Sequence, residues 1–171
     1  MIMRDYVLFW EWDVTATNPV WMACFSQWFD RSFIDPNHPN VIFKTAEHYM
    51  MFRKALLFDP DAAGAIVAAP TPEEAKRRGR EVENFDRDIW HEHADDIVET
   101  ACHLRFSQHA DMLEYLLETG DKLMVEASPT DRVWGIGFSV EEAPGKEEEW
   151  GANRMGLALT RAKKRLQQNS Q

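Results

Sequence analysis

The chain has 171 residues, with 29 acidic and 19 basic side chains that give a formal net charge of −10. This length suits one domain with a sizeable core, which we expect over residues 1–171 with its packed part at about 6–166. The negative balance argues against broad adhesion to nucleic acid or an anionic membrane, and leaves room only for a local basic pocket.

No apolar run approaches the roughly 20 residues that span a bilayer, and the N-terminal residues lack the organisation of a signal peptide. We therefore expect a cytoplasmic protein. Cys24 and Cys102 form neither a disulfide nor a metal-binding pattern and fit a reducing compartment. His91 and His93 lie two residues apart and cannot share a helical face, so we expect no metal site and no cofactor.

The first forty residues predict strands and packed aromatic rings. Tyr6–Trp12 is aromatic and β-branched, which predicts a strand. Residues 21–29 hold four aromatic rings around Ser26-Gln27, and core packing is the favoured interpretation for most of these rings. Short extended pieces are expected at Phe33-Ile34 and Val41–Phe43, on either side of a turn.

The segment from Phe43 to Phe58 predicts a helix that the rest of the chain packs around. Thr45 is a suitable N-cap, and Asp59-Pro60 ends the run. Both faces are largely apolar, so Glu47 in the first turn stands out as a buried carboxylate. The helix N-terminus favours its ionised form, which indicates a fixed carboxylate rather than a proton donor. Support of its own helix end is an equally good interpretation from spacing alone.

Two further helices follow. Asp59-Pro60 can start one, with Asp59 as its N-cap. Thr71-Pro72-Glu73-Glu74 has capping-box spacing and starts another, which ends in the basic run 76–80 with Gly79 as a terminator. The basic side chains can bind phosphate, but a solvated helix end is the favoured interpretation.

The second half of the chain alternates helix and strand signals. Asp88 is expected to cap a helix from Ile89 to about Phe106, and Gly120 to end another over 111–118. Residues 123–127 predict a strand.

The segment 131–137 contains two glycines that permit close backbone approach, without the spacing of a dinucleotide fingerprint or a P-loop. Asp131 is either a turn residue beside a buried ring or a pocket carboxylate beside a stacking surface, Trp134. Asn153 can cap the last helix, and residues 167–171 are expected to be frayed.

Taken together, the motifs resemble the NADAR family, whose bacterial members include the YbiA-type N-glycosidases. The matching residues run in family order from near the start into the last helix: Phe9-Trp10, Cys24–Phe29, Phe43–Met50, Lys54-Ala55, Trp90, Thr119–Asp121, Val125–Ser128, Asp131–Gly137, Trp150-Gly151, Asn153 and Gly156. Each motif is weak alone, whereas their ordered co-occurrence is specific. The resemblance implies a compact, helix-rich α+β domain with a small β-sheet and one polar cleft.

The resemblance also implies cleavage of N-glycosidic bonds to ribose. The implied substrates are ribosylamino-pyrimidine phosphates of riboflavin biosynthesis, or ADP-ribosylated guanine, free or in DNA. The positions carried over by motif are Glu47 and Asp131 as catalytic residues and Trp90 as a stacking wall. Weaker substrate-binding candidates are Trp134, Lys54, Asn153 and Gln27, the last because Gln stands where the family commonly has Asn.

These residue types suit the chemistry. A carboxylate near C1′ stabilises the oxocarbenium-like charge, so Glu47 is assigned as stabiliser or base and Asp131 as its partner. Lys54, or an arginine such as Arg53, can hold a phosphate. Direct water attack and a covalent intermediate both remain open. The alternative function is a non-catalytic module that binds NAD or ADP-ribose, and the presence of two acids favours catalysis over it.

Overall fold

The computed structural model describes residues 1–169, which form a helix-rich α+β fold with two small sheets. This fold class is the one that the sequence predicts. The elements in chain order are β1 (Tyr6–Phe9), α1 (Val20–Ala23), β2 (Phe33–Ile34), β3 (Ile42–Phe43), α2 (Ala46–Phe58), η1 (Pro60–Ala62), α3 (Ala63–Val67), α4 (Pro72–Arg80), α5 (Arg87–Ser107), α6 (Ala110–Glu118), β4 (Leu123–Glu126), η2 (Glu147–Glu149) and α7 (Arg154–Asn169).

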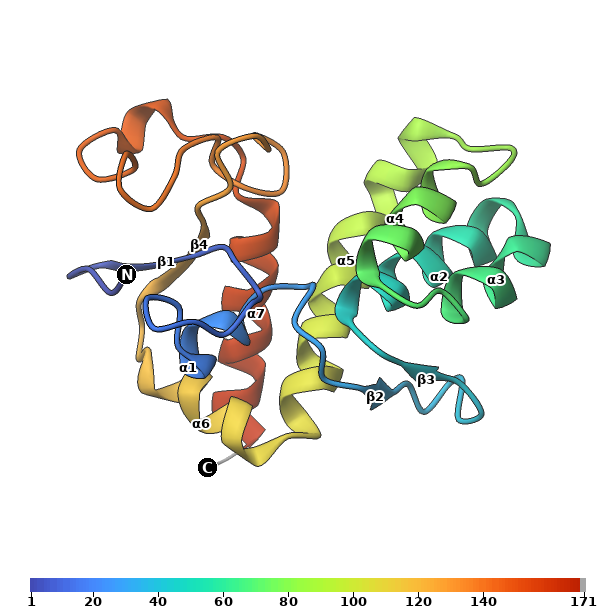
Figure 1. Cartoon of the computed structure of the whole chain (residues 1–171), viewed down its shortest axis with the longest axis horizontal. Helices are drawn as coiled ribbons and strands as arrows, with labels where there is room; N and C mark the ends of the chain where they lie inside the picture. The colour runs from blue at the N-terminus through green and yellow to red at the C-terminus, as the bar shows by residue number, and fades with distance from the viewer. Residues whose placement is uncertain (170–171) are drawn as a thin grey trace.

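Helix α5 joins the two sides of the molecule. It packs against α7, which lies beside β1 and β4, and against α2, which carries α3 and α4 (Figure 1). One continuous apolar core runs through these contacts, from β1 across α5 to α2. The segment after β4 and helix α4 lie at the same end of the molecule on opposite sides (Figure 1).

Both sheets are two-stranded. Strands β1 and β4 pair in parallel, with Phe9 opposite Glu126, and β2 pairs with β3 antiparallel, with Phe33 opposite Phe43. The β1–β4 pair brings together two segments more than a hundred residues apart in the sequence. Its register sets Trp10, the residue after β1, close to the end of β4.

Helix α2 begins as the sequence predicts, because the Thr45 hydroxyl accepts a hydrogen bond from the backbone N–H of His48. The ring of His48 bonds the same hydroxyl and the carbonyl oxygen of Ala69, which ties the helix start to the chain after α3. Most side chains of α2 are buried, Glu47 among them. The predicted central helix is confirmed.

The predicted cap of α5 is wrong, whereas the start of η1 and the end of α4 are partly as predicted. Asp86, not Asp88, caps α5, since its carboxylate accepts from the N–H groups of Asp88 and Ile89 at 2.9 and 3.0 Å. Asp59 is the N-cap of η1 and Pro60 its first residue, as the sequence predicts, but the Asp59 carboxylate makes no cap bond and accepts from the N–H of Glu83 instead. Helix α4 ends at Arg80, inside the predicted basic run, but Gly79 is the helical residue before that end and not its terminator; a Cβ atom there would collide with Met51 of α2.

Two further expectations concern the chain ends and membranes. Helix α7 continues to Asn169, so residues 167–169 of the tail expected to fray are helical. Residues 170–171 of that tail lie outside the described residues. Among residues 1–169, no helix combines the length and apolarity needed to cross a bilayer.

Candidate active site

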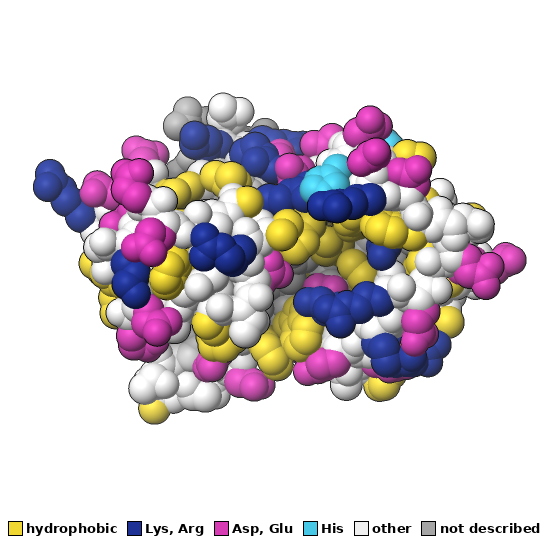
Figure 2. Space-filling view, turned by 90° about the horizontal axis from the view of Figure 1, so that it is seen from above, with side chains coloured by type: hydrophobic (Ala, Val, Ile, Leu, Met, Phe, Trp, Pro, Cys, Tyr) yellow, Lys and Arg dark blue, Asp and Glu magenta, His cyan; other side chains and the backbone are white. Residues whose placement is uncertain are grey.

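A cleft of about 480 Å³ lies at the end of the molecule where the segment after β4 faces α4. Viewed onto that end, the surface is hollowed, with hydrophobic side chains inside and charged side chains of both signs around them (Figure 2). The residues that line the cleft are Trp10, Trp12, Ser26, Gln27, Trp28, Glu47, Met50, Met51, Lys54, Lys76, Arg80, Trp90, Glu126, Ser128, Thr130, Asp131 and Trp134.

Glu47 lines the cleft and is 5% exposed. The indole N–H of Trp28 donates to its Oε2 at 3.2 Å, and the backbone N–H of Glu47 donates to the carbonyl oxygen of Gln27. Burial raises the pKa of its carboxyl above the ordinary value; Lys76 and the Trp28 bond offset part of this rise. The helix N-terminus predicts an ionised carboxylate, whereas burial shifts the group toward its neutral form and is the larger effect.

Asp131 is both a turn residue and a cleft carboxylate, the two interpretations that the sequence leaves open. Its Oδ1 accepts hydrogen bonds from the N–H groups of Val133 and Trp134, each at 2.8 Å, so it forms a turn. It also lines the cleft together with Trp134. The turn fixes Oδ1 and therefore fixes where the carboxylate lies relative to Glu47.

Glu126, the last residue of β4, is a third cleft carboxyl group that sequence reasoning missed. Burial, the charge of Asp131 and the charge of Glu47 raise its pKa to about 8, against a smaller opposing effect of Lys76. The available signal was its position: a glutamate that ends an apolar strand, in the motif Val125–Ser128.

Tryptophans form the walls of the cleft. Five of the seven line it: Trp10, Trp12, Trp28, Trp90 and Trp134. Trp12 and Trp28 lie against each other with ring centroids 4.7 Å apart, and the guanidinium of Arg154 lies 4.8 Å from the Trp134 ring. The core-packing interpretation is therefore wrong for Trp28, whose ring belongs to the cleft, although it holds for the fully buried Phe25.

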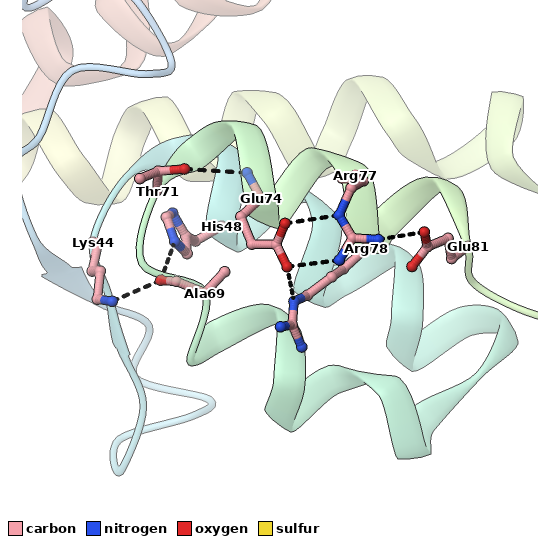
Figure 3. A network of polar contacts seen from close by, with 8 residues as sticks. All are labelled: Lys44, His48, Ala69, Thr71, Glu74, Arg77, Arg78 and Glu81. Carbon is pink, nitrogen blue, oxygen red and sulfur yellow. Dashed lines mark hydrogen bonds and ion pairs between the residues drawn. The ribbon is translucent and has the colours of Figure 1, made fainter.

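The basic run of α4 divides into two sets. Glu74 accepts hydrogen bonds from Arg77 and Arg78 on the outer side of the helix (Figure 3). Lys76 and Arg80 instead line the cleft. Arg77 and Arg80 are exposed, as a solvated helix end predicts, and Lys76 is half-buried. Lys76 and Arg80 lie four residues apart and therefore share the face of α4 that lines the cleft.

The two phosphate-binding candidates on α2 separate in the same way. Lys54 lines the cleft, and its ammonium donates to the carbonyl oxygen of Gly79 at 2.7 Å. Arg53 is not among the cleft-lining residues; it donates to the Tyr49 hydroxyl at 2.6 Å, and its guanidinium lies 3.9 Å from the Asp35 carboxylate.

Gln27 and Asn153 have different surroundings. Gln27 is 7% exposed and lines the cleft, and its Oε1 has no hydrogen-bond partner within residues 1–169. Asn153 lies outside the cleft lining: its amide donates to the carbonyl oxygen of Met124 and accepts from the N–H of Glu126, both at 3.0 Å. Its side chain therefore holds the backbone of strand β4 in place.

Residues 9–167 match the NADAR domain, and the chain belongs to the NADAR family. The chain is similar to the N-glycosidase R617 of Acanthamoeba polyphaga mimivirus, with 39% identity over 156 residues that cover 88% of this chain and 92% of the relative. It is 32% identical over 133 residues to the riboflavin biosynthesis protein PYRR of Zea mays, over 73% of this chain and 20% of that protein.

A solved structure has the same fold. The NMR structure of the Escherichia coli protein YbiA superposes with a TM-score of 0.75 at 24% identity, covering 99% of this chain and 89% of that one. By sequence, the Escherichia coli N-glycosidase YbiA is 30% identical over 122 residues, which are 71% of this chain and 69% of the relative.

Proposed function

We propose that this protein is an N-glycosidase that hydrolyses the bond between ribose and the nitrogen of a heterocyclic base or amine. The observation that carries the proposal is the grouping of Glu47, Glu126 and Asp131 in one tryptophan-walled cleft. Relatives that bear the name N-glycosidase support it. In this scheme Glu47 and Asp131 are the catalytic pair.

Breaking an N-ribosyl bond develops positive charge at C1′ and the ring oxygen of the sugar. Glu47 is held by Trp28 and Asp131 by its turn, so neither carboxyl needs to reorganise as that charge appears. One of the pair stabilises the charge and the other accepts a proton from the attacking water. Trp90 and Trp134 offer flat surfaces on which a heterocycle can stack.

The proposed substrate carries a 5′-phosphoryl group on its ribose. Lys54, Lys76 and Arg80 line the cleft together and supply the positive charge that such a group needs. A ribosylamino-pyrimidine phosphate of riboflavin biosynthesis has this group, and ADP-ribosylated guanine has it as part of a diphosphate. The likeness to the riboflavin biosynthesis protein favours the first of these substrates.

A non-catalytic module for NAD or ADP-ribose is the alternative function. Such a module gains nothing from acids in its cleft, whereas three carboxyl groups line this one. The alternative predicts tight binding of NAD or ADP-ribose without any product, which the assay below distinguishes from turnover.

The test is a turnover assay on five compounds: a ribosylamino-pyrimidine phosphate, ADP-ribosylated guanine as nucleotide, ADP-ribosylated guanine in DNA, NAD and ADP-ribose. Mass spectrometry follows the released sugar phosphate or free base. We expect release from at least one ribosylated base. Absence of product from all of them, with tight binding of NAD or ADP-ribose, overturns the proposal in favour of the binding module.

The variants Glu47→Gln and Asp131→Asn separate the site from the fold. Each keeps the shape of the side chain, and an amide oxygen can still accept the Trp28 or turn hydrogen bonds. We expect kcat to fall by at least about 100-fold in both, with the melting temperature within a few degrees of the wild-type value. The control is Glu118→Gln, an exposed change outside the cleft. Unfolding of either variant assigns that residue to the scaffold instead.

A further inference from the structure

The three carboxyl groups of the cleft differ in their hydrogen bonds. Glu47 accepts from the Trp28 indole, and Asp131 accepts from two backbone N–H groups of its turn. Within residues 1–169, the carboxyl of Glu126 makes no hydrogen bond, although it lines the same cleft. The proposed function gives Glu47 and Asp131 a role and leaves this third group unused.

The backbone N–H and carbonyl groups of Glu126 are both hydrogen-bonded, so the position of its Cα atom is fixed. Its N–H donates to the Asn153 amide oxygen at 3.0 Å, and its carbonyl oxygen accepts from the N–H of Ile136 at 3.0 Å. Across the parallel pair it stands opposite Phe9. A carboxyl group on an anchored strand end, without an internal partner, is available to a ligand in the cleft.

The charges around Glu126 favour its neutral form. Asp131 and Glu47 face it with like charge, while Lys76 is the cation that opposes them. With burial in addition, the pKa of the Glu126 carboxyl rises to about 8, so the group holds a proton at neutral pH. The Glu126 carboxyl also differs from those of Glu47 and Asp131 in accepting no hydrogen bond within residues 1–169, and carboxyl groups in different surroundings are the usual arrangement for one proton donor and one charge stabiliser.

We propose that Glu126 is the general acid of the cleft and protonates the leaving-group nitrogen as the N-glycosidic bond breaks. This role rests on the proposed function. The C1′–N bond breaks, its electron pair stays on nitrogen, and that nitrogen takes the proton of Glu126. Water forms the new C1′–O bond and passes its proton to the carboxylate of Glu47 or Asp131. That carboxyl group then releases the proton to solvent, and Glu126 takes a proton back from solvent. The net reaction consumes one water molecule and needs no other reactant.

The test is the pH dependence of kcat in the wild-type protein, Glu126→Gln and Glu126→Asp, on the substrate that the wild-type protein hydrolyses. We expect wild-type kcat to fall as the pH rises through the range in which the general acid loses its proton. Glu126→Gln should lower kcat by about 10²- to 10⁴-fold with little change in KM, and should lose this basic limb. Glu126→Asp should lose less activity than Glu126→Gln and keep the limb. Glu118→Gln is the control and should follow the wild-type profile.

Several outcomes overturn this role while leaving the proposed function intact. The first is a Glu126→Gln protein whose kcat is within about threefold of the wild-type value, which is too small a loss for a general acid. The second is a change in KM without a change in kcat. The third is a basic limb of the pH profile that persists in Glu126→Gln. Wild-type protein without turnover on any substrate overturns the proposed function, and the role of Glu126 with it. Glu126→Asp keeps the test decisive if Glu126→Gln fails to fold.

Discussion

At the scale of single residues, one carboxyl type has three different surroundings in one cleft. The turn around Asp131 gives its Oδ1 two backbone donors, Glu47 has one indole donor, and Glu126 has like charges facing it. Hydrogen bonds from donors favour the ionised form, whereas burial and like charge favour the neutral form. A division of labour among the three acids follows from these surroundings and not from residue type.

The raised pKa of Glu126 predicts a pH dependence of stability that needs no substrate. Its pKa is about 8 in the folded protein against an ordinary value of 4.5, so the native state binds the proton more tightly than the unfolded chain. The stability from this group is complete below about pH 4.5 and is lost as the pH rises through about 8. We expect the melting temperature of wild-type protein, relative to Glu126→Gln, to fall by several degrees between pH 5 and 8.

Calorimetric scans of both proteins across this range measure the effect, with Glu118→Gln as the control that should parallel wild type. Taking the difference between wild type and variant removes contributions that both share, such as Lys163, whose pKa burial lowers to about 8. A difference that stays constant with pH would show that Glu126 titrates normally.

At the scale of elements, α4 is brought close to α2 by a glycine. A Cβ atom on Gly79 would lie 2.1 Å from the sulfur and 3.0 Å from the Cβ of Met51, so alanine at this position displaces the Met51 side chain. The same contact lets the Gly79 carbonyl oxygen accept from the Lys54 ammonium. Because Met51, Lys54 and Lys76 all line the cleft, the α2–α4 spacing sets its shape.

Gly79→Ala is therefore expected to destabilise the protein by about 1–3 kcal/mol, as overpacking does. Gly64→Ala in α3 is the matched control: its added Cβ meets no atom within 4 Å, and it should stabilise by about 0.4–1 kcal/mol. Chemical denaturation of the two variants measures both values. Equal effects of the two substitutions would contradict the close packing of α4 on α2.

The sequence predicts elements better than it predicts what they bring together. Local signals identify α2 with its Thr45 cap, the turn at Asp131 and the start of α4 at Thr71, because these depend on neighbours in the chain. Gly79 looks like a helix terminator because its contact with Met51 is not local. The cap of α5 shifts by two residues since Asp86 and Asp88 are equivalent by residue type.

The same limit applies to the site. Six of the seven predicted site residues line the cleft: Gln27, Glu47, Lys54, Trp90, Asp131 and Trp134. Asn153 instead supports β4, Glu126 was missed, and Lys76 and Arg80 belong to the basic run for which phosphate binding was the less favoured interpretation. Whether a charged residue faces a cleft depends on the parallel pairing of β1 with β4 and on the rotation of α4, neither of which a single stretch of sequence specifies.

At the scale of the whole molecule, the net charge of the chain repels an anionic substrate, whereas the cationic side chains that line the cleft attract it. The chain carries a formal charge of −10, which repels such a substrate at long range. Salt shortens that repulsion to about 8 Å at physiological ionic strength, so the bound substrate responds mainly to nearby charges. The position of each cation on α4 should therefore matter more than the total charge.

Arg80→Ala and Arg77→Ala test this difference, because both remove one positive charge from α4 and only Arg80 lines the cleft. We expect Arg80→Ala to raise KM for a 5′-phosphorylated substrate about fivefold, the effect of about 1 kcal/mol for an exposed ion pair, with little change in kcat. Arg77→Ala should change KM by less than about twofold, since its partners are Glu74 and Glu81 on the outer side of the helix. Steady-state kinetics on the phosphorylated substrate and its dephosphorylated form measure both effects. Equal rises in KM for the two variants would assign the effect to net charge. If Arg80→Ala also raises KM for the dephosphorylated form, Arg80 contacts another part of the substrate.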